Sequence, residues 1–191
     1  MKVVAINGSA RRDGNTARLV GVVFEELRKA GIETELLQLA GRTVPGCRGC
    51  MRCHENKDRR CAVTSDTVNK FIAKMDEADG IILASPTYFA DVSASLKALM
   101  ERAGMVALAN GGMFARKPGA AVVAVRRGGA IHAFDTINHF FLISQMIVVG
   151  SNYWNMGIGL LPGDVDSDLE GIRTMRTLGQ HMAWLLPRLS P

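Results

Sequence analysis

Short runs rich in apolar residues alternate along this chain with segments in which apolar residues recur every three or four positions. The short runs predict strands at residues 3–7, 33–39, 80–85, 120–125 and 147–150. The three–four spacing is typical of one buried helix face and predicts helices at residues 15–30, 64–78, from about 92 onward, and 137–146. A last helix is expected after the turn at Asp164, Asp166 and Asp168, because carboxylates suit a helix N-terminus.

Strands that alternate with helices predict a parallel, doubly wound sheet with right-handed crossovers and helices on both of its faces. The run at residues 80–85 lacks polar alternation, as expected for a strand that is covered on both faces. Five strands fit the order 2-1-3-4-5. The sequence shows no internal repeat and no linker, so residues 1–191 are expected to form a single three-layer α/β domain.

Composition and charge narrow the functional classes. Hydrophobic residues make up 48% of the chain and charged residues 21%, which is typical of a globular protein. No leader-like segment precedes the first strand, and the apolar run at residues 140–150 is too short to span a bilayer, so we expect a cytoplasmic protein without a membrane partner.

The net charge is +5, and many of the arginines fall in predicted loops with few aromatic residues among them. This distribution indicates binding to small anions or to an acidic protein partner, and argues against nucleic acid. The arginines concerned are Arg11, Arg12, Arg48, Arg52, Arg59, Arg60, Arg126 and Arg127.

The loop after the first predicted strand has the composition of an anion site. It is small and polar, and a helical pattern follows it directly, so backbone N–H groups and the helix N-terminus converge on one point. Gly8 and Gly14 permit close approach of the backbone. Side-chain donors come from Ser9, Arg11, Asn15 and Thr16. The loop matches neither the G-x-x-x-x-G-K-[ST] nor the G-x-G-x-x-G fingerprint, so we predict a phosphate site of another kind.

Two further loops are expected at the same edge of the sheet, because they also follow parallel strands. The loop after residues 80–85 contains two aromatic residues outside any core pattern, Tyr88 and Phe89. These rings either line a flat ligand or pack on the helix that follows. The loop after residues 120–125 is Arg126-Arg127-Gly128-Gly129, which reads either as a close-approach loop or as a solvated basic patch.

Two of these loops resemble those of one family. The string G-S-x-R-x-x-x-N-T at residues 8–16 resembles the phosphate loop of the NADPH-dependent FMN reductase family, and P-T-Y-F-x-D-V-S-x-x-L-K at residues 86–97 is similar to its isoalloxazine loop. The resemblance implies a flavodoxin-like fold with bound FMN. Carried over by position, it implies FMN contacts from Ser9, Arg11, Asn15, Thr16, Pro86, Thr87, Tyr88 and Phe89. A looser match implies further contacts from Arg126, Arg127, Gly128 and Gly129.

The long segment at residues 40–63 holds every cysteine of the chain, in the spacing C-x2-C-x2-C-x7-C. The compact triplet is closer to iron–sulfur ligation than to the paired knuckles of zinc sites. It also resembles the motif of iron–sulfur flavoproteins, a branch of the same fold, which implies a [4Fe–4S] cluster beside the flavin. A zinc site with His54 as a spare ligand and a set of free thiols are the alternatives, while disulfides are not expected in a cytosolic chain. The ligands implied are Cys47, Cys50, Cys53 and Cys61.

The resemblance implies an FMN-dependent oxidoreductase in which NAD(P)H reduces the flavin and the flavin then reduces a small-molecule acceptor. The alternative function is an iron–sulfur flavoprotein that carries electrons between an acidic, ferredoxin-like donor and an acceptor without NAD(P)H. A third interpretation is a non-catalytic flavin- or nucleotide-binding sensor. The resemblance also implies a homodimer or homotetramer. Nothing in the sequence marks a nicotinamide site.

Overall fold

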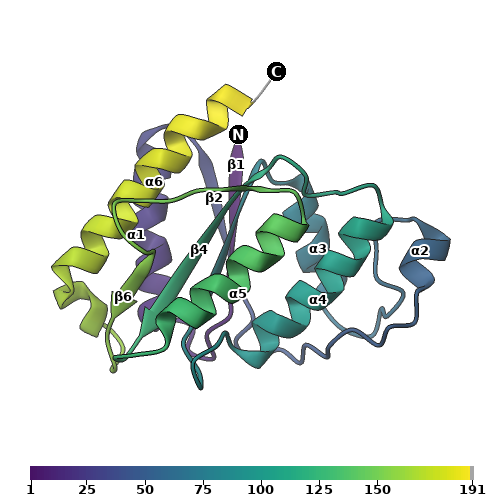
Figure 1. Ribbon diagram of the computed structural model, residues 1–191, viewed down its shortest axis with the longest axis horizontal. Helices are drawn as coiled ribbons and strands as arrows, with labels where there is room; N and C mark the ends of the chain where they lie inside the picture. Colours follow the sequence, from purple (N-terminus) through teal and green to yellow (C-terminus); the bar gives the residue numbers. More distant parts are fainter. Residues whose placement is uncertain (190–191) are drawn as a thin grey trace.

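The computed structural model describes residues 1–189, which fold into a parallel sheet between two layers of helices (Figure 1). The strands are β1 (Lys2–Asn7), β2 (Glu33–Gln38), β3 (Gly80–Pro86), β4 (Pro118–Val125), β5 (Ile147–Val148) and β6 (Met156–Ile158). The helices are α1 (Asn15–Lys29), α2 (Arg52–Asn56), α3 (Val68–Glu77), α4 (Ala94–Ala109), α5 (Ala130–Ile143) and α6 (Leu169–Leu189), with a 3-10 turn at Asp164–Ser167.

The strand order β2-β1-β3-β4-β5 confirms the predicted topology, and every pairing in it is parallel. Within residues 1–189 the sheet has a sixth strand, which the sequence did not predict. Strand β5 pairs with the start of β4 at Pro118 and Gly119, whereas β6 pairs with its end at Val123–Val125. Two short strands therefore share the edge beside β4.

Strands buried on both faces explain the continuous apolar runs. Along β1, Val3 and Ala5 belong to the core under α1 and α6, while Val4 and Ile6 belong to the core under α3, α4 and α5. Figure 1 shows the same two layers, with α1 and α6 on one side of the sheet and α3, α4 and α5 on the other. Alternate side chains of each central strand therefore enter different cores.

Helix boundaries differ from the expected ones for local reasons. Helix α3 begins at Val68 because the Asp66 carboxylate accepts a hydrogen bond from the Val68 N–H at 2.9 Å. Helix α4 begins at Ala94 after Ser93, whose hydroxyl accepts from the Leu96 N–H at 3.3 Å. Helix α5 spans Ala130–Ile143 and not residues 137–146, because its buried face starts with small alanines directly after Gly129.

No helix within residues 1–189 is both long and apolar enough to cross a membrane. The segment between β2 and α3 is mostly irregular, but it contains α2, a short helix that the sequence pattern did not predict. In Figure 1 this helix lies beyond α4, at the far end of the molecule from α6. The part of this segment that carries the cysteines, residues 45–63, therefore lies along α4 and outside the sheet itself. We call it the cysteine segment.

Candidate functional site

A pocket of about 200 Å³, which we call the loop pocket, opens at the carboxyl edge of the sheet. The loops after β1, β3 and β4 form it together with the segment after β6, as expected for a ligand site of an open α/β sheet. No aspartate or glutamate is among its lining residues in the part of the chain that is described. The lining residues are Ser9, Arg11, Gly14, Asn15, Thr16, Pro86, Thr87, Tyr88, Ala124, Arg126, Gly159 and Leu160.

Hydrogen bonds within the first loop fix its shape. The Asn7 side chain accepts from the Ser9 N–H at 3.0 Å, and the Ser9 hydroxyl accepts from the Arg11 N–H at 3.1 Å. Gly14 is the extended residue before α1, and a Cβ there would lie 3.0 Å from Cβ of Arg11. The loop thus curls tightly over the N-terminus of α1, whose first N–H groups have no intrahelical acceptor and suit an anion.

Arginines bring positive charge to this pocket from two loops. The Arg11 guanidinium reaches across the pocket and donates to the Leu160 carbonyl at 3.3 Å, and Arg126 enters from the loop after β4. Both arginines are exposed, so their side chains have room to rotate toward a ligand. Because acidic residues are missing from the described lining, the net field favours an anion.

Thr87 contributes an unsatisfied hydroxyl to the pocket. Its N–H donates to the Ala124 carbonyl at 2.8 Å, which fixes the loop after β3 against β4. Its Oγ1 is buried and has no hydrogen-bond partner among residues 1–189. Buried hydroxyls are normally paired, so this atom is consistent with a polar ligand group beside it.

Phe89 lies outside this pocket. The loop turns sharply at Phe89 and Ala90, which have φ angles of 48° and 63°, and two hydrogen bonds between the backbones of Tyr88 and Asp91 close it. The Phe89 ring is fully exposed, at 105%. Gly129 packs against this turn, since a Cβ there would lie 2.9 Å from Cα of Ala90.

The loop after β4 reaches the pocket through Arg126 alone among its four predicted residues, as far as residues 1–189 show. Arg127 and Gly128 are exposed, and Gly129 is the residue that precedes α5. The FMN contacts predicted for these three residues and for Phe89 are not part of the pocket in this structure, and they stay predictions.

Sequence reasoning missed the segment after β6. Gly159 lies so close to α1 that a Cβ would be 2.8 Å from the Asn15 amide nitrogen and from the backbone nitrogen of Val165. The Asn15 side chain in turn accepts from the Gly163 N–H at 2.9 Å. Asn15 therefore attaches this segment to the first loop. The glycine-rich string G-I-G-L-L-P-G at residues 157–163 was the available signal.

The four cysteines line a second, narrow pocket against α4, which we call the thiol pocket. All four thiols are free; Cys47 and Cys50 are exposed, Cys61 is half-buried, and Cys53 is buried on α2. Burial raises the pKa of the Cys53 thiol, and the nearby thiols of Cys47 and Cys61 raise it further. The remaining lining residues are Arg102, Met105 and Val106 of α4 and, from the segment that carries the cysteines, Gly46, Arg48, Gly49, Met51, Ala62 and Val63.

The donor chemistry of this thiol pocket fits a soft metal group. Four thiols and no carboxylate line it within residues 1–189, which suits iron–sulfur or zinc ligation and excludes a hard-cation site of oxygen ligands. In the geometry described for residues 1–189, no three Cys, His, Asp or Glu side chains are disposed to hold a metal ion. The imidazole Nε2 of His54 is buried without a partner among the described residues, and His54 does not line the pocket there.

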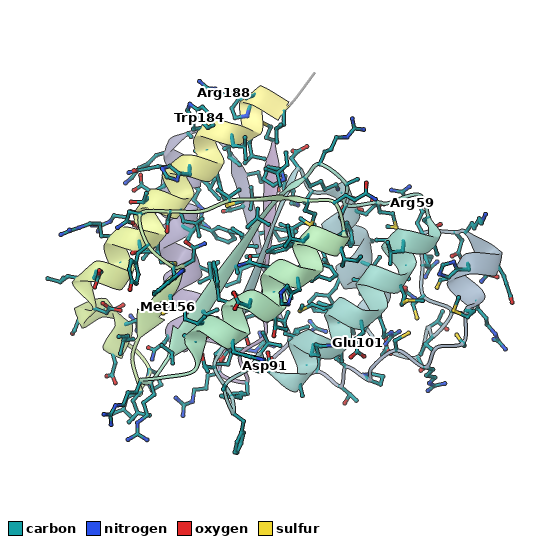
Figure 2. All side chains as sticks on the ribbon, viewed as in Figure 1. Arg59, Asp91, Glu101, Met156, Trp184 and Arg188 are labelled. Atoms are coloured by element: carbon teal, nitrogen blue, oxygen red, sulfur yellow. The ribbon has the colours of Figure 1, made fainter. Side chains whose placement is uncertain are left out.

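An open groove of about 760 Å³ runs between α4 and α5. Cys47 lines it near the thiol pocket, and Asp91 lines it near the loop after β3. Figure 2 shows Asp91 at the loop end of the two helices and Glu101 farther along α4, toward the cysteine segment. The thiol pocket and the loop pocket share no lining residue in the described chain, so the two are distinct pockets within one chain.

The sequence profile of the NADPH-dependent FMN reductase family matches residues 1–160. The chain belongs to this family. The match covers every lining residue of the loop pocket and all four cysteines. As a member of the FMN reductase family, the chain is related to flavin-binding oxidoreductases. This agrees with the resemblance of its loops after β1 and β3 to the phosphate and isoalloxazine loops of that family.

Several relatives of this FMN reductase family member share the name iron–sulfur flavoprotein. A protein of Methanocaldococcus jannaschii named iron–sulfur flavoprotein is 43% identical over 190 residues, which cover 96% of each chain. One from Methanosarcina thermophila with the same name is 33% identical over 87% of this chain and 86% of its own. The crystal structure of a WrbA-like flavodoxin from Agrobacterium tumefaciens has a TM-score of 0.69 at 15% identity and covers 99% of this chain and 98% of its own, which confirms the flavodoxin-like fold.

Proposed function

We propose that this protein is a two-centre electron-transfer flavoprotein, with FMN in the loop pocket and a [4Fe–4S] cluster in the thiol pocket. The observation that carries the proposal is the convergence of all four thiols on one pocket of a flavin-family fold. The name iron–sulfur flavoprotein, shared by relatives of nearly equal length, supports it. When bound, FMN supplies exchange of one or two electrons and the cluster supplies exchange of one.

In this proposal each loop has a defined task. The N-terminus of α1 and the Arg11 guanidinium bind the phosphate, with Ser9 and Thr16 beside it. The Thr87 hydroxyl donates to a polar edge of the ring, and Tyr88 covers part of its apolar surface. The four cysteines hold the iron–sulfur group in the thiol pocket, against Arg102, Met105 and Val106 of α4.

Charge around the cysteines supports an acidic protein as the electron partner. Arg48, Arg52 and Arg60 are exposed on the same segment as the thiols. A basic rim attracts an acidic carrier and orients it toward the pocket. The family description also favours NAD(P)H as the electron donor, and the two donors are separated by the assay below.

The phosphate assignment predicts that Arg11→Ala weakens FMN binding by about ten- to a hundredfold, because a charge-assisted contact contributes about 1.5–3 kcal/mol. Fluorescence titration of flavin-free protein measures this. Arg12→Ala is the matched control, since Arg12 is a neighbouring exposed arginine outside the pocket lining within residues 1–189. Riboflavin lacks the phosphate and should bind wild type and Arg11→Ala alike. Equal FMN affinity in wild type and Arg11→Ala contradicts the assignment.

The cluster assignment predicts about four irons per chain after anaerobic reconstitution with iron and sulfide, and their loss in Cys50→Ser. Metal analysis and spectroscopy of the reduced protein measure this. Stoichiometric zinc, or no metal, contradicts it. Reduction of the bound flavin by a reduced ferredoxin but not by NAD(P)H supports the carrier function, whereas rapid NAD(P)H oxidation supports the reductase function.

A further inference from the structure

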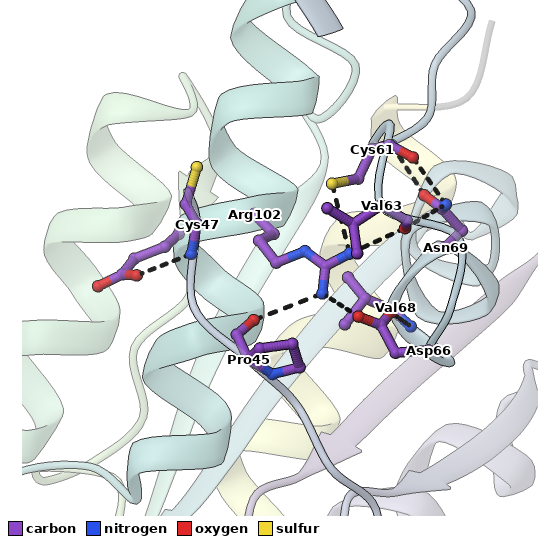
Figure 3. Close-up of polar contacts among 9 residues, drawn as sticks. Pro45, Cys47, Cys61, Val63, Asp66, Val68, Asn69 and Arg102 are labelled. Carbon is purple, nitrogen blue, oxygen red and sulfur yellow. Dashed lines mark hydrogen bonds and ion pairs between the residues drawn. The ribbon is translucent and has the colours of Figure 1, made fainter. Parts of the chain in front are cut away.

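An arginine is buried behind the thiol pocket. Arg102 on α4 is 2% exposed, and its guanidinium contacts both ends of the cysteine segment (Figure 3). Nη1 donates to the Asp66 carboxylate at 2.6 Å and to the Pro45 carbonyl at 3.4 Å. Nη2 donates to Cys61 Sγ at 3.3 Å and to the Val63 carbonyl at 3.1 Å. One side chain therefore connects the start of the segment, its end and one thiol.

Burying the Arg102 charge costs free energy, so its place in the core needs an explanation. A buried guanidinium loses its hydration, and a single ion pair seldom recovers that loss. Here the Asp66 carboxylate is the acidic partner, with a side chain 9% exposed, and it is itself held by the Val68 N–H. The Nε of Arg102 has no partner among residues 1–189. An apolar residue would fill α4 more cheaply, so the core alone does not account for an arginine.

Cys61 is held by side chains from two helices. The Asn69 side chain on α3 accepts from the Cys61 N–H at 2.8 Å and donates to the Cys61 carbonyl at 2.9 Å. Figure 3 shows Asn69 and Arg102 on opposite sides of Cys61. Its backbone is thus fixed from α3 and its sulfur from α4. Cys47 and Cys50, by contrast, are exposed.

We propose that Arg102 is the positioning residue of the thiol pocket: it closes residues 45–63 onto α4, aims Cys61 Sγ into the pocket, and raises the reduction potential of the iron–sulfur group bound there. The last part rests on the proposed function, and the first two do not. Reduction adds one negative charge to the bound group. A buried cation that also donates a hydrogen bond to a ligand sulfur stabilises the reduced form, and solvent screens it little.

The metal-free arm of the test compares Arg102→Lys with wild type by hydrogen exchange and mass spectrometry. Lysine keeps the charge but lacks the fork that spans Pro45, Asp66 and Cys61. We expect amide exchange within residues 45–63 to accelerate about tenfold, as loss of a charged hydrogen bond implies. Peptides of β1 and α1 should exchange as in wild type. Unchanged exchange in residues 45–63 overturns the positioning role.

The loaded arm measures the midpoint potential of reconstituted protein in a mediated titration, followed by absorbance and paramagnetic resonance. Arg102→Gln should shift the potential to a more negative value. Asp66→Asn, nearly identical in shape, leaves the Arg102 charge uncompensated and should shift it to a more positive value. Arg52→Gln removes an exposed charge from the same segment and should shift it less than Arg102→Gln.

Opposite signs distinguish tuning from mere support of the fold, since structural damage would move both variants in the same direction. Shifts of the same sign, or no shift, overturn the electrostatic role. Asp66→Asn retains the arginine and decides the question if Arg102→Gln does not fold. Wild type that takes up no iron contradicts the proposed cluster, and hydrogen exchange then still decides the positioning role.

Discussion

Asp66 is the acidic partner of the buried Arg102, with a distance of 2.6 Å between the Arg102 Nη1 and the carboxylate. Burial by itself raises the pKa of its carboxyl, but hydrogen bonds from Arg102 and the Val68 N–H, with the Arg102 and Arg48 charges, hold the pKa below its usual range. A carboxyl whose pKa is lowered by folding stabilises the protein above its unfolded-state pKa, and this contribution disappears as the pH falls through the folded-state pKa. Asp66 therefore stabilises the fold near neutrality and not in acid.

We predict that Asp66→Asn lowers the free energy of unfolding at neutral pH, and that its difference from wild type shrinks as the pH falls below about 4, the unfolded pKa of an aspartate. Urea unfolding at a series of pH values measures both curves. A difference that stays constant from neutral to acidic pH contradicts this linkage.

The residues of the loop pocket differ in how far sequence could reveal them. Ser9, Arg11 and Thr16 follow one another between a strand and a helix, so local order alone places them together. Gly159 and Arg102 gain their roles only through contacts with distant segments. Arg102 also lies among the buried positions of α4, and no pattern in the neighbouring sequence predicts that a charged residue is buried there.

At the scale of elements, helix α3 depends on a lysine outside it. Lys117, just before β4, donates to the Met75 carbonyl at 3.2 Å, to the Ala78 carbonyl at 2.7 Å and to the Asp76 carbonyl. These carbonyls lie at the C-terminus of α3, where the last carbonyls of a helix have no intrahelical donor. The ammonium group therefore fastens the end of α3 to the start of β4.

Lys117→Met should lower the free energy of unfolding by about 1.5–3 kcal/mol, because hydrogen bonds from a charged group are lost and buried carbonyls remain unpaired. Lys70→Met is the matched control, since Lys70 is exposed on the same helix. Its effect should stay within about 0.5 kcal/mol. Chemical denaturation of both variants measures this, and equal effects would refute the role of Lys117.

The elements that sequence predicted well are those with long apolar patterns. Strands β1, β3 and β4 and helix α1 agree with the expected ranges to within about two residues. Strand β6 has three residues and α2 has five, too few for a periodic pattern to show. Their positions are set by pairing with β4 and by packing on α4, which are tertiary contacts.

At the scale of the whole molecule, the thiol pocket is peripheral to the fold at two of its cysteines, while Cys53 and Cys61 are attached to the core and to its helices. Cys47 and Cys50 are exposed, whereas Cys53 packs within the core under α3, α4 and α5. The metal-free fold should therefore tolerate changes at the first two positions and not at the third.

We predict that Cys47→Ser with Cys50→Ser changes the stability of the metal-free protein by less than about 0.5 kcal/mol and leaves FMN affinity unchanged. Cys53→Ser should cost about 1–3 kcal/mol, because it places a hydroxyl in an apolar core. Thermal unfolding and flavin titration measure both. Loss of FMN binding in the double variant would mean that the two pockets depend on each other.

In a parallel sheet all strands begin at one edge, the amino edge, and end at the other, the carboxyl edge. The Lys117 anchor lies at the amino edge, while the loops of the loop pocket lie at the carboxyl edge. Most of the contacts that fasten α3 to the sheet therefore lie away from the loop pocket, so exposed loop residues that do not line the pocket can change with little effect on the fold. A mutant library confined to residues 89 and 127–128, which do not line the loop pocket within residues 1–189, should yield variants that still fold and still bind FMN, as thermal unfolding and flavin titration would show.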